Sequence, residues 1–145
     1  MGKLQIKIVT YTEALEEIRL IRTLVFHKEQ GVDLELEFDG KDSAAEHLLA
    51  YLDNQAVGTA RIRQLSEDIV KIERVAVVKS ARGKGIGKKL TQTALDLAMQ
   101  QGFEAATIHA QEYVKGLYSQ LGFVQVGDKF DEAGIPHVKM VRKLR

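Results

Sequence analysis

The chain has 145 residues, of which 45% are hydrophobic and 28% are charged, and it carries a formal net charge of +1. This length and composition predict one soluble globular domain over residues 1–145, and they exclude a disordered or fibrous chain. The near-neutral charge gives no long-range attraction to nucleic acid or to an anionic membrane, and the lack of cysteine excludes disulfides, thiolate zinc sites and cysteine nucleophiles.

The first half of the chain alternates between strand-like and helix-like patterns. Residues 4–9 alternate like a half-buried strand, and a helix capped by Thr10 or Thr12 is expected to follow and to end near Gly31. The acidic stretch 33–40 has no clear period and predicts a loop. Residues 47–52 and 56–63 are then expected to form a hairpin, because turn-forming residues separate them.

The second half places a strand, a glycine-rich turn and a helix in that order. The strand is expected over residues 69–78, and the helix runs from residue 88 to near Gly102. The remaining elements are a strand at 104–110, a short helix at 113–121, and strands at 123–126 and 137–144 with Gly134 and Pro136 in the loop between them. No apolar run approaches the roughly 20 residues of a membrane span. We therefore expect a cytoplasmic α/β protein with mixed strand pairing.

The glycine-rich segment is the most informative part of the chain. Glycine lets the backbone adopt positive φ and approach a ligand closely, and the first turn of the following helix presents unpaired N–H groups at its positive end. Arg82, Lys84 and Lys88 add positive charge, so the segment predicts a seat for a phosphate or pyrophosphate. It lacks the hydroxyl of a Walker A loop and the third glycine of a dinucleotide fingerprint. The alternative is a structural turn with solvated lysines.

The pattern Arg82-x-x-Gly85-x-Gly87 resembles the acyl-CoA pyrophosphate loop of the GNAT superfamily of N-acetyltransferases. Residues 73–77 resemble the central strand of that family, and residues 116–123 resemble its later tyrosine helix and exit. Two further segments resemble a small single-domain bacterial-type subgroup, namely 26–32, which contains Glu-Gln-Gly-Val, and 134–137, which reads Gly-Ile-Pro-His. The resemblance implies a mixed α+β sheet flanked by about four helices, with splayed central strands.

The resemblance implies acetyl-CoA as the acyl donor. Backbone amides of the glycine turn would bind its pyrophosphate, and strand backbone groups would hold the pantetheine arm, with one N–H polarising the thioester carbonyl. Gln111 would hold the arm or a water where many family members have asparagine. The implied donor-binding residues are Val75, Ala76, Val77, Arg82, Gly83, Lys84, Gly85, Ile86, Gly87, Lys88 and Gln111.

Two side chains are candidates for proton transfer. Tyr118 would protonate the leaving thiolate, because a phenol has an ordinary pKa of about 10 and a thiol one of about 8.5; the alternative is a ring that only packs in the core. Glu73 would take a proton from the amine, or it pairs structurally with Arg61, Arg63 or Arg74. His109 either shares the base role or is structural. The histidines lack close metal-ligand spacing, so no metal is expected.

The implied acceptor is a primary amine, with a small molecule favoured over a protein. Arg22, Glu29, Arg61 and His137 come from segments that border the acceptor side in this family. The acidic stretch 33–39 favours a cationic acceptor, Arg61 and Arg63 favour an acidic one, and solvated surface charge is the alternative for all of them. We expect direct transfer without nucleic-acid or membrane partners, and a homodimer is compatible with the sequence. The alternatives to an enzyme are a non-catalytic acyl-CoA sensor and a protein-interaction module.

Overall fold

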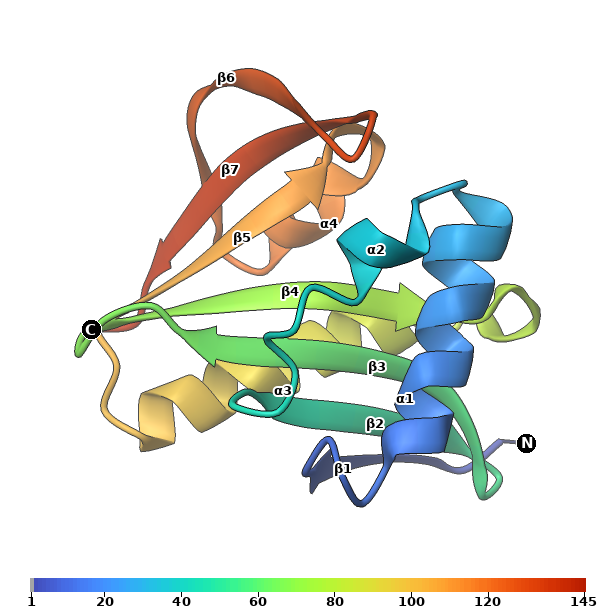
Figure 1. Cartoon of the computed structure of the whole chain (residues 1–145). Helices are drawn as coiled ribbons and strands as arrows, with labels where there is room; N and C mark the ends of the chain where they lie inside the picture. The colour runs from blue at the N-terminus through green and yellow to red at the C-terminus, as the bar shows by residue number, and fades with distance from the viewer. Residues whose placement is uncertain (1) are drawn as a thin grey trace.

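The computed structural model describes residues 2–145, whose strands form one mixed seven-stranded sheet in the order β1-β2-β3-β4-β5-β7-β6 (Figure 1). Neighbouring strands run antiparallel except β4 and β5, which run parallel. The strands are β1 (Leu4–Val9), β2 (Glu46–Leu52), β3 (Gln55–Gln64), β4 (Ile69–Val77), β5 (Ala105–Gln111), β6 (Val124–Glu132) and β7 (Ile135–Lys143).

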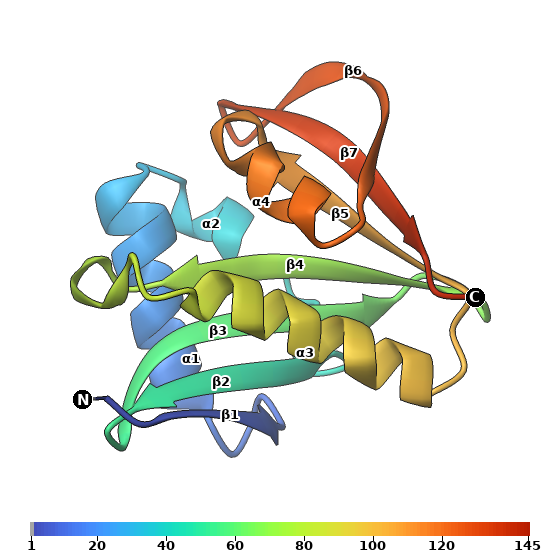
Figure 2. The same ribbon diagram turned by 180° about the vertical axis from the view of Figure 1, so that it is seen from behind.

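Helices cover both faces of the sheet. On one face lie α1 (Leu15–Arg22), its π-helical continuation η1 (Thr23–Glu29) and the one-turn α2 (Leu34–Glu37) (Figure 1). On the other face lie α3 (Ile86–Gln100) and α4 (Lys115–Gln120), preceded by the 3₁₀ turns η2 (Lys79–Ala81) and η3 (Glu112–Val114) (Figure 2). No helix within residues 2–145 is both long and apolar enough to cross a membrane.

Consecutive side chains of a strand point to opposite faces of the sheet. The middle strands are therefore buried on both sides, since helices cover both faces. Leu48 and Ala50 of β2 join the core under α3, where they meet Leu90, whereas Leu49 joins the core under α1, where it meets Ile18. All five of these residues are fully buried. The two cores fix α1 and α3 against opposite faces of the same strands.

Three sequence expectations differ from the structure. The helix expected to run unbroken to Gly31 changes to π-helical geometry at Thr23, and Gln30 donates its N–H to the carbonyl of Val25. The acidic stretch 33–40 is not simply a loop, since it begins with α2, where the Asp33 carboxylate accepts the N–H of Glu35. The last two strands are longer than expected: residues 130–132 pair with residues 135–137 across a turn at residues 133–134, so Pro136 lies in β7 and not in the loop.

The parallel pairing of β4 with β5 is short, and the two strands then separate. Residues Ile69–Ile72 pair with residues Ala105–Ile108, and the rest of β4 and β5 diverges (Figure 1). In β4 a bulge follows at once, where Arg74 and Val75 together lie opposite Ala60 and Arg74 adopts a φ of +56°. A bulge bends the strand that carries it. The expected splay of the central strands is present, and it opens the space described next.

Candidate functional site

A cavity of about 820 Å³ lies between the diverging ends of β4 and β5. Its wall includes parts of η1, α2, the turn before α3, α4 and the β6–β7 hairpin. The predicted catalytic residues Tyr118 and Glu73 both line it, as do Glu29 and His137. Residues that are far apart in the sequence are therefore brought to one enclosed space by the split in the sheet.

One end of the cavity is the glycine turn. Gly83 and Gly85 adopt φ of +79° and +75°, a left-handed conformation that L-residues rarely take, and a Cβ built on either would meet no atom within 4 Å. Gly85 caps α3, and the first helical hydrogen bond runs from the Lys89 N–H to the Gly85 carbonyl. The preceding amides therefore have no partner within the helix, and the turn that carries them lines the cavity, which is the geometry that an anion seat requires.

Most predicted donor residues reach this cavity. Lys84 is the exception, since it does not line the wall. The residues that do line it are Val75, Ala76, Val77, Arg82, Gly83, Gly85, Ile86, Gly87, Lys88 and Gln111. The Gln111 amide exchanges hydrogen bonds with the amide of Gln30, at 2.9 and 3.4 Å between nitrogen and oxygen, so its orientation is fixed by η1 rather than left free.

Arg82 is held by a carboxylate from the other side of the cavity mouth. Its terminal nitrogens lie 2.8 and 2.6 Å from the two carboxylate oxygens of Glu29, and its Nε donates to the carbonyl of Val77. The hydrogen bond from Arg82 holds the pKa of Glu29 below its usual range. Glu29 was expected on the acceptor side, but the structure places it against the glycine turn.

Tyr118 packs in the core and also lines the cavity. Its ring packs edge-to-face on Phe123, with 6.1 Å between centroids, and the side chain is 6% exposed. Burial raises the pKa of Tyr118 to about 12, so the phenol stays protonated at neutral pH. Its hydroxyl has no hydrogen-bond partner within residues 2–145, which leaves it free to donate to a ligand in the cavity.

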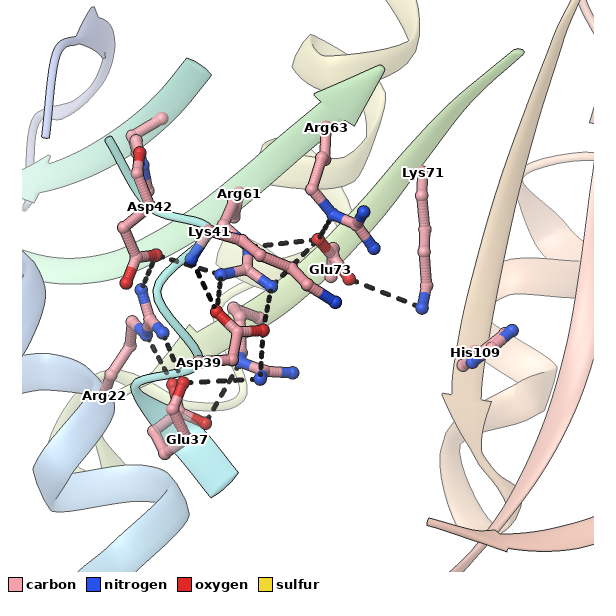
Figure 3. Close-up of polar contacts among 12 residues, drawn as sticks. Arg22, Glu37, Asp39, Lys41, Asp42, Arg61, Arg63, Lys71, Glu73 and His109 are labelled. Carbon is pink, nitrogen blue, oxygen red and sulfur yellow. Dashed lines mark hydrogen bonds and ion pairs between the residues drawn. The ribbon is translucent and has the colours of Figure 1, made fainter. Parts of the chain in front are cut away.

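A network of ion pairs holds the acidic segment after η1 against the sheet (Figure 3). Arg22 bonds to Glu37 and Asp42, and Arg61 bonds to Asp39 and Asp42. Arg22 and Arg61 are both at most 1% exposed and do not line the cavity. They were predicted to bind the acceptor, but their guanidinium groups lie behind the wall because the carboxylates of 37–42 surround them.

Glu73 is the meeting point of three cations. Its Oε1 lies 2.9 Å from Arg61 Nη2 and 2.8 Å from Arg63 Nε, and its Oε2 lies 3.4 Å from Lys71 Nζ. Burial raises the pKa of Glu73, but Arg63, Arg61 and Lys71 outweigh it and leave the pKa below its ordinary value. Glu73 is thus ionised, paired and at the cavity wall at once. Arg74 pairs elsewhere, with Glu37 and Asp39.

A second charged group lies on the strands across the cavity. His109 Nδ1 is 2.9 Å from Glu132 Oε1, and His137 Nε2 is 3.7 Å from Glu132 Oε2. The rings of both histidines pack against Phe130, with centroids 5.1 and 6.1 Å away. No sequence pattern marks Glu132 as a site residue, because β6 is exposed along nearly its whole length and shows no alternation that would mark an inward carboxylate.

Comparison with known proteins gives a consistent result. Residues 9–144 match the sequence profile of the acetyltransferase (GNAT) domain. The uncharacterized protein YyaT of Bacillus subtilis is 35% identical over 144 residues, which cover 97% of each chain. An acyl-CoA N-acyltransferase from Pseudomonas aeruginosa superposes with a TM-score of 0.86 at 30% identity, covering 97% of this chain and 99% of the other. A GNAT acetyltransferase from Elizabethkingia anophelis with acetyl-CoA bound shares the fold, with a TM-score of 0.74 at 16% identity over 97% of each chain.

Proposed function

Because this chain belongs to the GNAT family of acetyltransferases, we propose that it transfers the acetyl group of acetyl-CoA directly to a primary amine on a small molecule. The observation that carries the proposal is one cavity that joins an anion seat, a protonated phenol and an ionised carboxylate. Its volume of about 820 Å³ lies within the range of about 300–1,000 Å³ that is usual for small-molecule sites.

The donor would lie along β4. The amides of Ile86, Gly87 and Lys88, at the start of a 15-residue helix, would bind its diphosphate. Beyond Ile72, β4 has no strand partner on its β5 side, so backbone groups of Val75–Val77 are available to an extended amide-bearing arm. This placement brings the thioester toward Tyr118 and Glu73.

Tyr118 is proposed to assist the leaving group. When the amine attacks the thioester carbonyl, a C–N bond forms and the C–S bond breaks, leaving a thiolate. A phenol with a pKa of about 12 gives its proton to a thiolate of ordinary pKa near 8.5 only at a cost of about 5 kcal/mol. We therefore assign Tyr118 as a hydrogen-bond donor to the developing thiolate, with proton transfer completed in the desolvated cavity, where burial also raises the pKa of the thiol.

Glu73 is proposed to act on the amine through water. An ammonium group has an ordinary pKa of about 10.4 and must lose a proton before it attacks. A carboxylate whose pKa is held low by Arg63, Arg61 and Lys71 is a weak direct base, but it is a fixed acceptor that can orient a water molecule. In this proposal the amine gives its proton to that water, which passes it to the Glu73 carboxylate and from there to solvent.

Thiol release from acetyl-CoA, followed with a panel of primary amines, tests the proposal. The expected result is amine-dependent release of CoA together with the N-acetylated product detected by mass spectrometry. Acetyl-CoA binding measured by calorimetry serves as the companion measurement. Binding without release for any amine would identify an acyl-CoA sensor instead of an enzyme acting on small amines.

A further inference from the structure

Charge in the site is distributed unevenly between two walls, and this distribution bears on the acceptor. On one wall and directly behind it, five cationic side chains are joined by ion pairs to four carboxylates. Lys41 lies beside them and also lines the cavity (Figure 3). The group therefore carries two excess positive charges at neutral pH.

The excess charge lies on the cavity side of the network. The innermost guanidinium groups, on Arg22 and Arg61, are saturated by carboxylates and closed to solvent. Lys41, Arg63 and Lys71 line the cavity beside Glu73 and retain free donors, and we call these three the cationic wall. Arg74 also lines the cavity, but it is turned to Glu37 and Asp39. An acceptor that enters the cavity meets these three side chains and not the arginines behind them.

The free donors of the cationic wall point into shared space. Arg63 bonds to Glu73 through Nε alone, and its Nη1 and Nη2 have no partner within residues 2–145. The Lys41 ammonium is likewise without an ion-pair partner in the described chain, and Lys71 contacts Glu73 at 3.4 Å. Figure 3 shows the ends of these side chains on the same side of Glu73, with His109 beyond Lys71. A planar fork and two ammonium groups suit the oxygens of an anionic group.

The opposite wall has the opposite charge. Glu132 lies there between His109 and His137 and is 41% exposed. The hydrogen bond from His109, with a longer-range contribution from Lys71, holds the pKa of Glu132 below its ordinary value, so the carboxylate is ionised at neutral pH. Lys71 and Glu132 line the same cavity of about 820 Å³, so one small molecule in it can contact both walls.

We propose that the acceptor is a small amine that also carries an oxyanion group, a carboxylate or a phosphate, which binds the cationic wall while the amino group lies between the carboxylates of Glu73 and Glu132, within reach of the water that Glu73 orients. The proposal rests on the proposed function and deepens it, because it specifies which amines the site takes. An acceptor of this kind is dipolar, and each of its ends meets opposite charge. A polyamine or a plain alkylamine would leave the donors of the cationic wall unpaired.

Matched pairs of amines test the proposal directly. Methionine is compared with 3-(methylthio)propylamine, phenylalanine with phenethylamine, and phosphoethanolamine with ethanolamine; the first two pairs report on a carboxylate and the third on a phosphate. The expected kcat/KM is about 10- to 100-fold higher for the oxyanion-bearing member of at least one pair, the size expected for a charge-assisted hydrogen bond. Equal or faster acetylation of the members that lack the oxyanion, or of spermidine, would overturn the proposal while leaving acetyl transfer to amines intact.

Variants show whether the cationic wall causes the preference. Lys41→Met removes a charge that has no ion-pair partner in the described chain, so the fold is expected to be kept, and the ratio of kcat/KM within the preferred pair should fall about tenfold. Arg63→Lys keeps the charge and removes the fork. Lys143→Met is the matched control, since Lys143 is exposed and lies outside the cavity, and it should leave the ratio unchanged. An unchanged ratio in Lys41→Met and Arg63→Lys, with both proteins folded by thermal unfolding, would refute the assignment.

Binding of the acetylated products separates this inference from the proposed function. N-acetylmethionine and N-acetyl-3-(methylthio)propylamine are titrated into the CoA-loaded protein by calorimetry, which needs no turnover. Tighter binding of the carboxylate product, weakened by Lys41→Met, supports the oxyanion subsite even if no amine is acetylated. Equal binding of the two products counts against it whatever the transfer assay shows.

Discussion

Replacing Gly85 by alanine is expected to separate the stability of the glycine turn from its use in binding. Gly85 has a φ of +75°, and a Cβ there would meet no atom within 4 Å, so the substitution adds backbone strain without a clash in the free protein. The strain of an L-residue in this conformation is about 1–2 kcal/mol. For a domain of this size that corresponds to a fall in Tm of about 3–8 °C.

Gly85→Ala should weaken acetyl-CoA binding by more than its loss of stability would explain. The open space beside Gly85 is part of the cavity wall where the proposed diphosphate binds, so the added methyl group occupies ligand volume. We expect acetyl-CoA to bind at least about tenfold more weakly, a loss of about 1.4 kcal/mol. Calorimetric titration gives the affinity, and thermal unfolding without ligand gives the stability.

Gly127→Ala is the matched control for this experiment. Gly127 has a φ of +81° and equally open surroundings, but it lies in β6 outside the cavity wall. The two variants should lose similar stability, and Gly127→Ala should bind acetyl-CoA as the wild type does. If Gly85→Ala is destabilised like Gly127→Ala and yet binds acetyl-CoA normally, the turn is structural and the diphosphate assignment fails.

Three further substitutions test the site. Tyr118→Phe should lower kcat about 100-fold or more with little change in acetyl-CoA affinity, because only the hydroxyl is removed; unchanged turnover in stopped assays would eliminate the phenol. Glu73→Gln should lower kcat at neutral pH by about tenfold or more. The Tm is measured as well, since Arg61, Arg63 and Lys71 each lose an ion pair. Turnover equal to wild type would eliminate Glu73. Asp39→Asn should cost about 1–3 kcal/mol at pH 7, because Arg61 and Arg74 lose an ion pair that is partly open to solvent. The pKa of Asp39 is lowered by Arg61 in the folded state, so its stabilisation is present above the ordinary carboxyl pKa of about 3.9 and is lost as pH falls below it; a difference in Tm between Asp39→Asn and wild type that stays constant from pH 7 to pH 3 would contradict this reasoning.

The elements that the sequence predicted well are those whose pattern is local. The turn-forming residues between 47–52 and 56–63 place β2 and β3 within one or two residues of their observed bounds, and the apolar spacing after the glycines marks α3. Each of these patterns depends on neighbours within a few positions of the chain. The π-helical turn at Thr23 carries no comparable local signal, so the helix was expected to continue through it.

The charged network could not be predicted in the same way. Glu37 lies 15 residues from its partner Arg22, and Asp39 lies 22 residues from Arg61. Charge alone gave two contradictory expectations, a cationic acceptor from the acidic stretch and an acidic acceptor from the arginines. Folding pairs these two sets with each other and leaves Lys41, Arg63 and Lys71 to face the cavity. The excess positive charge at the cavity wall depends on which side chains pair in the folded structure, and a pattern in a single sequence does not give those pairs.

The short contact between β4 and β5 has a mechanical consequence. Backbone pairing between β4 and β5 is limited to residues Ile69–Ile72 and Ala105–Ile108. The sheet therefore consists of two parts, β1–β4 and β5–β7, that are joined only along this short contact. A molecule that binds the unpaired ends of both β4 and β5 would restrict the movement of these two parts of the sheet relative to each other. Donor binding would thus slow amide hydrogen exchange on both edges together, far beyond the atoms that the donor touches.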